Sequence, residues 1–585
     1  MSRGLIAERA RLSVFVARRG VRLLYGSISA HPLLRWRFVS TSTDRLLIAP
    51  QDLRTADPTR ASELYAGRYA FAGKIVICDG RSPFVLTPPS MEWTENLASF
   101  GWLRQLRAAE SGITRAHARS LVNDWITEQG RWDPVAWRPD VVARRIISWL
   151  THAPFLLHEA DMRFYRRFLR SLTRQVRYLR RASGNLRDGL PRLQAAIALT
   201  FAALCMAGQL RLLKPVGTRL IGELDRQILP DGGHVSRNPG VLTDLLLDLL
   251  PLRQAFAARN MVPPEALTNA IDRMMPMLRF FRHGDGTFAH FNGMGPTAPD
   301  LLATVLAYDD ARGKPVANAV HSGYQRLEAG GVVLLMDTGC PPPLPLSHEA
   351  HAGCLSIELS AGRNRIVLNC GMPSTSRDSW RYAARMTAAH STVTVNQTCS
   401  CRFLAAGALQ RMLGAPILDG PTEVLVWREE DAEGSKLRAV HNGYAARFGM
   451  LHERTVLLAV DGRRLDGEDT ILPARGRELR SHSSDQFVLR FHLHPSVRAN
   501  RLTHRHGVML TLPNRDIWTF EAYEHEVEIE DSAYLGAAEG PRHTSQIVIY
   551  GEARKTPRIA WSFVQVDPAE ARSFQRATEE SELAR

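Results

Sequence analysis

The sequence predicts an α+β protein of more than one domain, in which a helical half is followed by an antiparallel β-sandwich. From about residue 95 to 310 the apolar residues recur every three or four positions, as they do on amphipathic helices. After about residue 320 the period changes to two, in short β-branched runs. Because a chain of 585 residues is too long for one hydrophobic core, two or three domains are expected.

The helical half consists of amphipathic segments such as WLRQLRAAESGITRAHARSLVNDWI and FYRRFLRSLTRQVRYLRR. Prolines fall in the gaps between these segments, where a missing N–H is least harmful. Roughly six to ten helices joined by short loops must pack pairwise into an all-α domain. The arginines on their outer faces, Arg144 and Arg145 among them, are expected to be solvated.

The second half contains short alternating runs, such as GGVVLLMD, STVTVN, FVLRFHLHP and TSQIVIYG, that Gly, Asp and Asn turns separate. Strands at this density, with almost no helix between them, indicate an antiparallel sandwich. The expected division is residues 1–90 as a basic arm and packing segment, 91–318 as the helical domain and 319–585 as the β-sandwich. Within the first segment, LYAGRYAFAGKIVICDGRSPFVL predicts one or two strands.

The charge of the chain is concentrated at its N-terminus. The formal net charge is +15, which favours acidic partners such as nucleic acid, an acidic polysaccharide or an anionic membrane. Residues 1–50 hold nine arginines against Glu8 and Asp44. This arm is interpreted either as a basic helix packed on the body or as a peripheral contact with an anionic membrane. Because no helix-turn-helix signature or aromatic-basic RNA motif is found, nucleic acid is not an expected partner.

Cysteine usage and hydropathy give further expectations. No stretch approaches ~18 consecutive apolar residues, so no transmembrane segment is predicted. No apolar run followed by a small-residue cleavage site is visible, so a secretory signal is not expected. The seven cysteines cannot all pair, and reduced thiols are the default expectation.

Polar residues cluster in five short motifs. They are GNLRDGL with Asn185; DGGHVSRNPG with His234, Arg237 and Asn238; FAHFNGMG with His290 and Asn292; SHEAHAGCLSIELS with His348 and His351; and RMTAAHSTVTVN with Arg385 and His390.

In this order the five motifs resemble those of the heparinase II/III-like polysaccharide lyases. The resemblance implies an incomplete (α/α) toroid joined to a β-sandwich, with a cleft that receives a sugar chain. It also implies a substrate that is an acidic, uronate-containing glycan of the glycosaminoglycan kind, and β-elimination as the reaction. A location in the cell envelope or periplasm would suit such a substrate, whereas the absence of a visible signal peptide favours the cytoplasm.

β-Elimination requires a neutralised carboxylate, a base for the C5 proton and an acid for the departing O4. By resemblance, Asn185 would neutralise the carboxylate, His234 and His351 would serve as base and acid, and His390 would be a further histidine of the cleft. The expected substrate-binding residues are Arg237, Asn238, His290, Asn292 and Arg385. Structural roles compete with these: Asn185 could cap a helix, and the others could be turn or core residues.

Two positions depart from the family pattern. The family places a catalytic tyrosine where this chain has Val241. Members with a structural zinc use two histidines and an aspartate, and the matching positions here are His351, Asn369 and His390. An amide supplies no charge and is a poor zinc ligand, so no metal cofactor is expected.

Two functional hypotheses therefore follow from the sequence. The first is a lyase. The second is a catalytically inactive glycan-binding or envelope-assembly protein with the same fold. The particular glycan and the oligomeric state cannot be read from the sequence.

Overall fold

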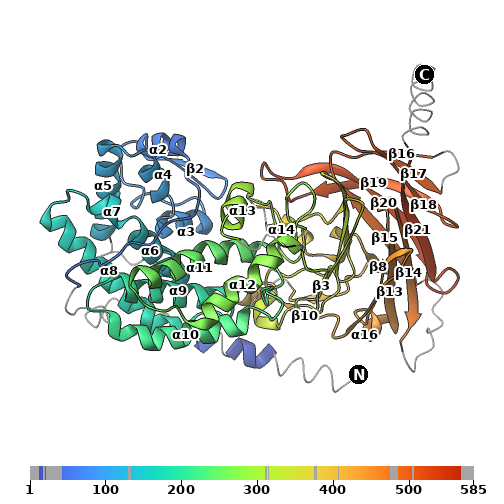
Figure 1. Cartoon of the computed structure of the whole chain (residues 1–585), viewed down its shortest axis with the longest axis horizontal. Helices are drawn as coiled ribbons and strands as arrows, with labels where there is room; N and C mark the ends of the chain where they lie inside the picture. Colours follow the sequence, from blue (N-terminus) through green and yellow to red (C-terminus); the bar gives the residue numbers. More distant parts are fainter. Residues whose placement is uncertain are drawn as a thin grey trace, which may run out of the picture. The chain divides into compact units, whose positions relative to one another are not determined.

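The computed structural model describes residues 12–17, 20–21, 43–128, 133–309, 313, 315–374, 378–405, 407–474, 485–502 and 506–567 (Figure 1). Most of the predicted basic arm thus lies outside the described residues. The chain divides into two compact units: a helical unit of residues 1–232, 243–275 and 300–311, and a β unit of 233–242, 276–299 and 312–585. The β unit therefore includes two short segments from within the range predicted to be helical.

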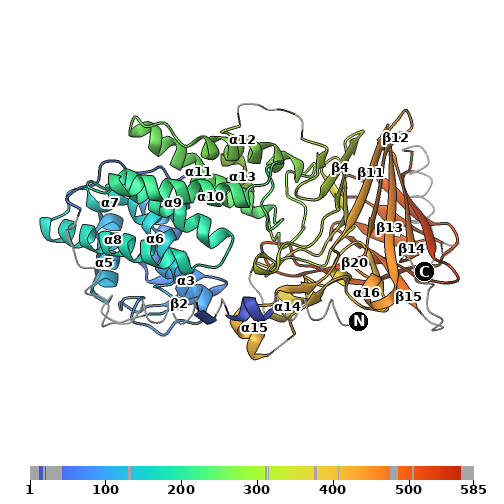
Figure 2. The same cartoon turned by 90° about the horizontal axis from the view of Figure 1, so that it is seen from below.

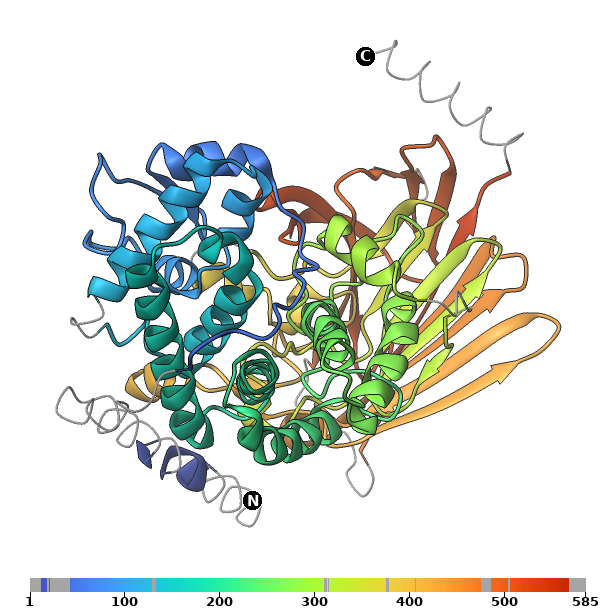
Figure 3. The same cartoon turned by 60° about the vertical axis from the view of Figure 1, so that its left-hand side comes forward.

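The helical unit begins with a short helix and a β-hairpin, which agrees with the strands predicted there. Its helices curve into an open ring (Figure 3). The elements are α2 (Pro58–Tyr65), β1 (Arg68–Phe71), β2 (Lys74–Ile77), α3 (Met91–Ser99), α4 (Leu103–Ala108), α5 (Gly112–Glu128), α6 (Pro139–Thr151), α7 (Ala153–Leu157), α8 (Met162–Ala182), η2 (Ser183–Asn185), α9 (Leu190–Cys205), η3 (Leu210–Leu212), α10 (Leu213–Gln227), α11 (Gly240–Ala258), α12 (Glu265–Phe280) and α13 (Pro299–Leu306).

Helices α6 and α9 form the centre of this unit. Helix α9 is rich in Ala and Leu and is buried almost all round, whereas α8 buries one face and leaves arginines on the other. Helix α6 contacts α3, α8 and α9. Aromatic rings fill the space beside it: Trp149 stacks on Phe168 with ring centroids 4.9 Å apart, and Trp125 meets Trp149 edge-on. The recurrence of apolar residues every three or four positions therefore predicted the outward, arginine-rich face of α8 correctly.

Arg145 is an exception, because the prediction that it is solvated is wrong. Its side chain is fully buried, and it donates hydrogen bonds to the carbonyl oxygens of Ala98 (2.8 Å) and Ala136 (3.0 Å). The guanidinium also lies 4.1 Å from the centre of the Trp125 ring. Burial lowers its pKa to about 9. Helix periodicity does not reveal this role, because the carbonyl groups come from chain segments outside α6.

The β unit contains two large antiparallel sheets (Figure 2). One has the strand order β11-β12-β13-β14-β21-β18-β17-β16. The other has the order β19-β20-β15-β7-β6-β5-β4-β3, with β8 also paired to β15. The strands are β3 (Asn318–Ala319), β4 (Tyr324–Ala329), β5 (Val332–Asp337), β6 (Ile357–Ala361), β7 (Asn364–Leu368), β8 (Val393–Val395), β11 (Val424–Glu430), β12 (Gly434–His441), β13 (Met450–Ala459), β14 (Arg464–Pro473), β15 (Gln486–Leu493), β16 (Arg498–Arg501), β17 (Gly507–Thr511), β18 (Ile517–Ala522), β19 (Val527–Tyr534), β20 (Arg542–Glu552) and β21 (Arg558–Gln565).

Smaller elements connect these strands. They are the two-stranded sheet of β9 (Arg402–Phe403) and β10 (Ile417–Asp419), the helices α14 (Asp378–Ala383), α15 (Ala408–Leu413) and α16 (Ala445–Phe448), and the 3-10 turns η4 (Leu344–Leu346) and η5 (Thr387–Ala389).

One hydrophobic core joins the two large sheets. It includes Leu334 and Ile357 from one sheet and Val456, Trp561 and Phe563 from the other. Strand β13 shows most clearly how a sheet contributes one face to this core, because alternate residues along the whole length of the strand are buried. The prediction of a helical region followed by an antiparallel β-sandwich is thus confirmed. Among the described residues, no helix is both long and apolar enough to cross a membrane.

Candidate functional site

Several predicted site residues meet in a buried polar network around Asp337 of β5. Arg237 pairs with this carboxylate, and Asn292 Nδ2 donates to it at 3.0 Å. Tyr324 donates its hydroxyl to the backbone oxygen of Arg237 (2.6 Å) and accepts from Asn292 Nδ2 (2.7 Å). Arg237 and Asn292 both have positive φ values, 63° and 45°. Residues with side chains adopt such values only where their surroundings hold them, and this network does so.

A second network surrounds Glu358 of β6, which is fully buried. Its carboxylate pairs with Arg365 and lies 3.2 Å from His283 Nε2. It also accepts from the backbone N–H of His290 (2.9 Å) and from the backbone N–H and the amide of Asn369 (3.0 and 3.1 Å). Burial alone would raise the pKa of Glu358, but Arg365 and His283 hold it well below its usual value.

His351 and His390 contact each other directly. His390 Nδ1 is 2.8 Å from the carbonyl oxygen of Met386, which can only accept, so Nδ1 carries the proton and Nε2 does not. His351 Nδ1 therefore donates to His390 Nε2 at 2.9 Å. The backbone N–H of His351 donates to Asn292 Oδ1, which connects this pair to the Asp337 network. His351 Nε2 is left as a buried acceptor without a hydrogen bond to any residue that the structure describes.

Burial keeps these imidazoles neutral. It lowers the pKa of His390 to about 4 and that of His290 to about 3, and it holds the pKa of His351 well below 6.5. His351 and His390 have relative exposures of 4% and 1%. They therefore belong to the interior of the β unit.

The remaining candidates in this unit have local roles. His234 Nδ1 accepts from the backbone N–H of Ser236 (3.1 Å), and burial lowers the pKa of His234 to about 4. Asn238 Oδ1 accepts from the N–H of Gly240 at 2.9 Å. Arg385 donates to the carbonyl oxygens of Ser347 and Ala350, both at 2.9 Å, and so fixes the loop that leads to His351.

Asn185 belongs to the helical unit, whereas the other predicted catalytic and substrate-binding residues belong to the β unit. It ends the 3-10 turn η2, and α9 begins five residues later with Gly189 as its N-cap, so the alternative role of Asn185 as a helix cap is wrong. Its half-buried side chain makes no hydrogen bond to the residues that the structure describes. Its convergence with the histidines stays a prediction.

The residues at the family's zinc position do not fit a metal ion. His351 and His390 turn nitrogens toward each other in a hydrogen bond, and Asn369 uses its oxygen to accept from Ser391 N–H (3.0 Å) and its nitrogen to donate to Glu358. The set carries no negative charge. Within the described ranges, no three His, Cys, Asp or Glu side chains are grouped closely enough to hold a metal.

A buried ion pair that the sequence analysis missed supports both histidine loops. Arg454 of β13 faces Asp469 of β14 in register, and Arg454 Nε lies 2.8 Å from Asp469 Oδ1. Arg454 Nη1 also donates to the carbonyl oxygens of Leu355 (2.7 Å) and Ser391 (2.8 Å). The sequence does contain a signal for this pair: Arg454 is a charged residue at a position of β13 where the alternation predicts a buried side chain. A buried charge needs a partner of opposite charge.

The fold of the chain is a heparinase-like architecture. Residues 311–562 match the family described as heparinase II/III-like, C-terminal. Among solved structures, heparinase III aligns with a TM-score of 0.68 at 14% identity, over 92% of this chain and 89% of that one. A heparan sulfate lyase HepC mutant from Pedobacter heparinus aligns with a TM-score of 0.59 at 14% identity, over 91% and 87%. These structures share the fold.

The chain belongs to the heparinase II/III-like family, as its sequence motifs predicted. A full-length relative is FtsZ-localized protein C from Caulobacter vibrioides (strain NA1000 / CB15N). It is 31% identical over 529 residues, which cover 88% of this chain and 90% of that protein.

Proposed function

We propose that this chain is a heparinase-fold protein that acts by binding, in association with FtsZ, and does not carry out β-elimination. The main support is the chemistry of the buried histidine pair: His351 and His390 form a hydrogen bond with each other in the interior, and Val241 stands where the resemblance places the family's tyrosine. The proposal thus favours the binding or assembly hypothesis over the lyase hypothesis.

The electrostatics explain why these groups suit a structural role. A general base must reach the C5 proton and have a pKa near the working pH. His234 and His390 have pKa values lowered to about 4, and both side chains are buried. Valine has no group that can take or give a proton. The chain therefore retains the polar scaffold of the fold without an accessible group of suitable basicity among these three positions.

The name of the full-length relative supports the second part of the proposal. That protein is called FtsZ-localized, and its similarity to this chain extends over both units. A shared association with FtsZ is the simplest role that needs no elimination chemistry.

An assay of elimination tests the first part. The purified chain is incubated with heparan sulfate, chondroitin sulfate, alginate and polygalacturonate, with heparinase III as the positive control, and ultraviolet absorbance of unsaturated product is followed. We expect no product from this chain. Product that forms with the natural sequence and disappears in Asn185→Ala would overturn the proposal.

Elimination is kept as the second candidate for one reason. Asn185 has an amide without a hydrogen bond to the described residues, as a group that neutralises a substrate carboxylate would have. The Asn185→Ala comparison addresses this candidate directly.

Co-sedimentation tests the second part. FtsZ from the same organism is polymerised with GTP and pelleted in the presence of this chain. We expect the chain in the pellet only when polymers form. Equal amounts in the pellet with and without FtsZ would contradict the association.

A further inference from the structure

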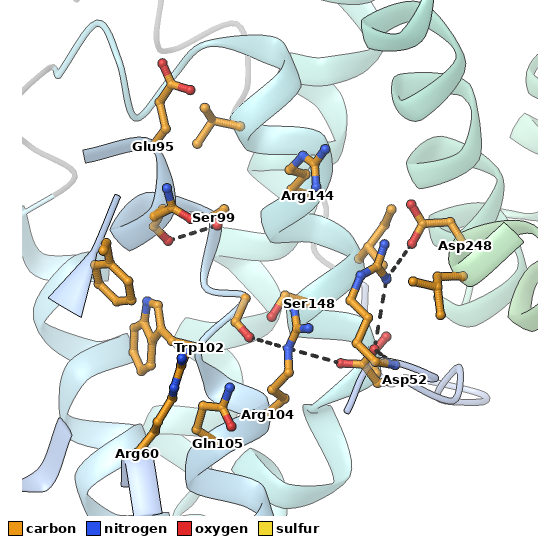
Figure 4. Close-up of a pocket in the computed structure, with 18 of the residues that line it drawn as sticks. Asp52, Arg60, Glu95, Ser99, Trp102, Arg104, Gln105, Arg144, Ser148 and Asp248 are labelled. Atoms are coloured by element: carbon orange, nitrogen blue, oxygen red, sulfur yellow. Dashed lines mark hydrogen bonds and ion pairs between the residues drawn. The ribbon is translucent and has the colours of Figure 1, made fainter. Parts of the chain in front are cut away.

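The helical unit contains a cavity of about 610 Å³ (Figure 4). Its lining includes five arginines and five acids: Arg54, Arg60, Arg68, Arg104, Arg144, Asp52, Glu63, Glu95, Asp140 and Asp248. Several of these charges are already engaged within the protein. Arg54 Nη1 lies 2.8 Å from Asp248 Oδ1, and Arg144 interacts with the carboxylate of Asp244. A different surface, without an assigned role, lies along strand β11 of the β unit.

Strand β11 forms one of the four edges of the two large sheets. The other three edge strands are short or charged. Strand β3 has two residues, β16 is four residues long with an arginine at each end, and β19 contains three acidic residues. Short strands and charges keep sheet edges from pairing with other chains. Strand β11 has seven residues and begins with four apolar ones, Val424–Trp427, so its first half lacks these protections.

The side chains of this apolar half of β11 lie on two faces. Val424 and Val426 pack against the hydrophobic core, whereas Leu425 and Trp427, on the opposite face, are 46% and 44% exposed. Arg438 of β12 lies 4.8 Å from the centre of the Trp427 ring and supports one side of the indole. On the side away from β12, the backbone groups of β11 make no hydrogen bond to residues that the structure describes. Free backbone donors and acceptors therefore lie beside two exposed apolar side chains.

Acidic residues flank the apolar stretch on both sides. They are Glu423 before it and Glu429, Glu430, Asp431 and Glu433 after it, and all of them are exposed. Arg428 pairs with Glu430 at 2.6 Å, and Lys436 of β12 lies opposite Glu429. These two cations leave a local surplus of negative charge, although the whole chain carries +15. The edge is therefore apolar in its middle and acidic at its ends.

We propose that β11 accepts, as an added strand, an extended segment of a partner protein that has apolar residues in its middle and lysines or arginines at its ends. The backbone of this segment continues the sheet beyond β11 through main-chain hydrogen bonds. Its apolar side chains pack on Leu425 and Trp427, because opposite residues of paired strands have Cβ atoms about 4.5 to 5.5 Å apart. Its basic ends lie beside Glu423 and Glu429, and this charge complementarity selects a basic segment over an acidic one.

Fluorescence anisotropy of labelled peptides, titrated with the full chain, tests this proposal. The probes are the basic peptide KRVTVYVRK, the same peptide N-methylated at its backbone nitrogens, and the acidic counterpart EEVTVYVEE. We expect only the unmodified basic peptide to bind, and salt at about 0.5 M should weaken its binding because salt screens charge. Equal binding of the N-methylated or the acidic peptide, or no binding of the basic one, would overturn the proposal.

Two pairs of variants provide the residue test. Leu425→Lys should weaken binding of the basic peptide at least about fivefold, because a repelling charge replaces an apolar cross-strand contact. Ile75→Lys, at an exposed position of β2 in the helical unit, is its matched control and should leave the affinity unchanged. Glu429→Lys should also weaken binding, whereas Glu528→Lys, exposed on the edge strand β19, should not. Unchanged binding in both β11 variants would place the peptide elsewhere and overturn the proposal.

Folding of each variant is checked by circular dichroism, and Glu429→Lys keeps the test valid if Leu425→Lys does not fold. Sedimentation velocity without peptide addresses the other possible occupant of the edge, a second copy of the chain. We expect the natural sequence and Leu425→Lys to sediment alike. A dimer of the natural sequence that Leu425→Lys dissociates would overturn the proposal, because a second copy would then occupy β11.

Discussion

At the scale of single residues, the β unit buries one ionisable group, Glu358, in its charged form and another, His390, in its neutral form. Glu358 stays charged because Arg365 and His283 compensate its burial. His390 stays neutral because burial disfavours the charged form of its imidazole. Identical residue types on the surface would titrate near their ordinary values, so the surroundings and not the residue type decide the charge. The pH dependence of stability follows from this difference.

Lowering the pH from 7 to 5 should destabilise the β unit in part through His390. Its pKa is lowered to about 4 in the folded protein, against about 6.5 in an unfolded chain. The unfolded state binds the proton first, so this contribution is complete above pH 6.5 and is lost as the pH falls toward 4. The slope approaches about 1.4 kcal/mol per pH unit for one histidine.

Urea unfolding at several pH values should therefore give a shallower slope for His390→Gln than for the natural sequence. His543→Gln, at an exposed position of β20, is the control and should keep the natural slope. Identical slopes for all three proteins would contradict the assignment of a neutral, buried His390.

At the scale of elements, two hairpin turns in the β unit contact each other. Strands β4 and β5 are joined by Gly330 and Gly331, both at positive φ, as a two-residue turn requires. A Cβ atom on Gly330 would lie 1.9 Å from the backbone oxygen of Asp461, in the turn between β13 and β14. A Cβ on Gly331 would meet nothing within 4 Å. The close approach therefore requires glycine at the first position for space as well as for conformation.

Gly330→Ala and Gly331→Ala form a matched pair that tests this contact. Both place a side chain at positive φ, which costs about 1 to 2 kcal/mol. Only Gly330→Ala must also displace backbone, so its cost should be larger by at least about 2 kcal/mol, at the upper end of what single substitutions cause. Urea unfolding of the two variants should separate them, and equal losses of stability would contradict the close packing of the two turns.

At the scale of the whole molecule, charge is distributed unevenly. Residues 1–42 carry eight arginines and one acid, Glu8, so they provide seven of the fifteen net positive charges. The cavity of the helical unit has a formally neutral lining. A preference of the chain for anionic surfaces is therefore expected to reside in this arm.

Vesicle sedimentation can test this expectation. The full chain should pellet with vesicles of anionic lipid and not with neutral ones, and about 0.5 M salt should weaken the binding because it screens charge. A chain that begins at Thr43 should stay in the supernatant, with its fold checked by circular dichroism. Undiminished binding of the shortened chain would place the basic surface elsewhere.

The motifs allowed the family and several members of the buried network to be predicted from sequence. Arg237, Asn292, His351 and His390, which the resemblance placed in a sugar-binding cleft, lie in one connected set of hydrogen bonds in the interior of the β unit. Their carboxylate partners were not predicted. Glu358 lies in the run SIELSA. The period-two alternation of this run predicts which face of the sheet each side chain lies on, but it does not predict which residues lie beside it on that face.

The sequence by itself determined the order of a helical region and an antiparallel sandwich, because periodicity records which side of each element avoids water. It also predicted Val241 at the position of the family's tyrosine. Tertiary structure alone decided which polar groups are buried and which are paired. Those properties depend on contacts between residues far apart in the chain, such as Arg454 with Leu355, and local sequence patterns contain no record of them.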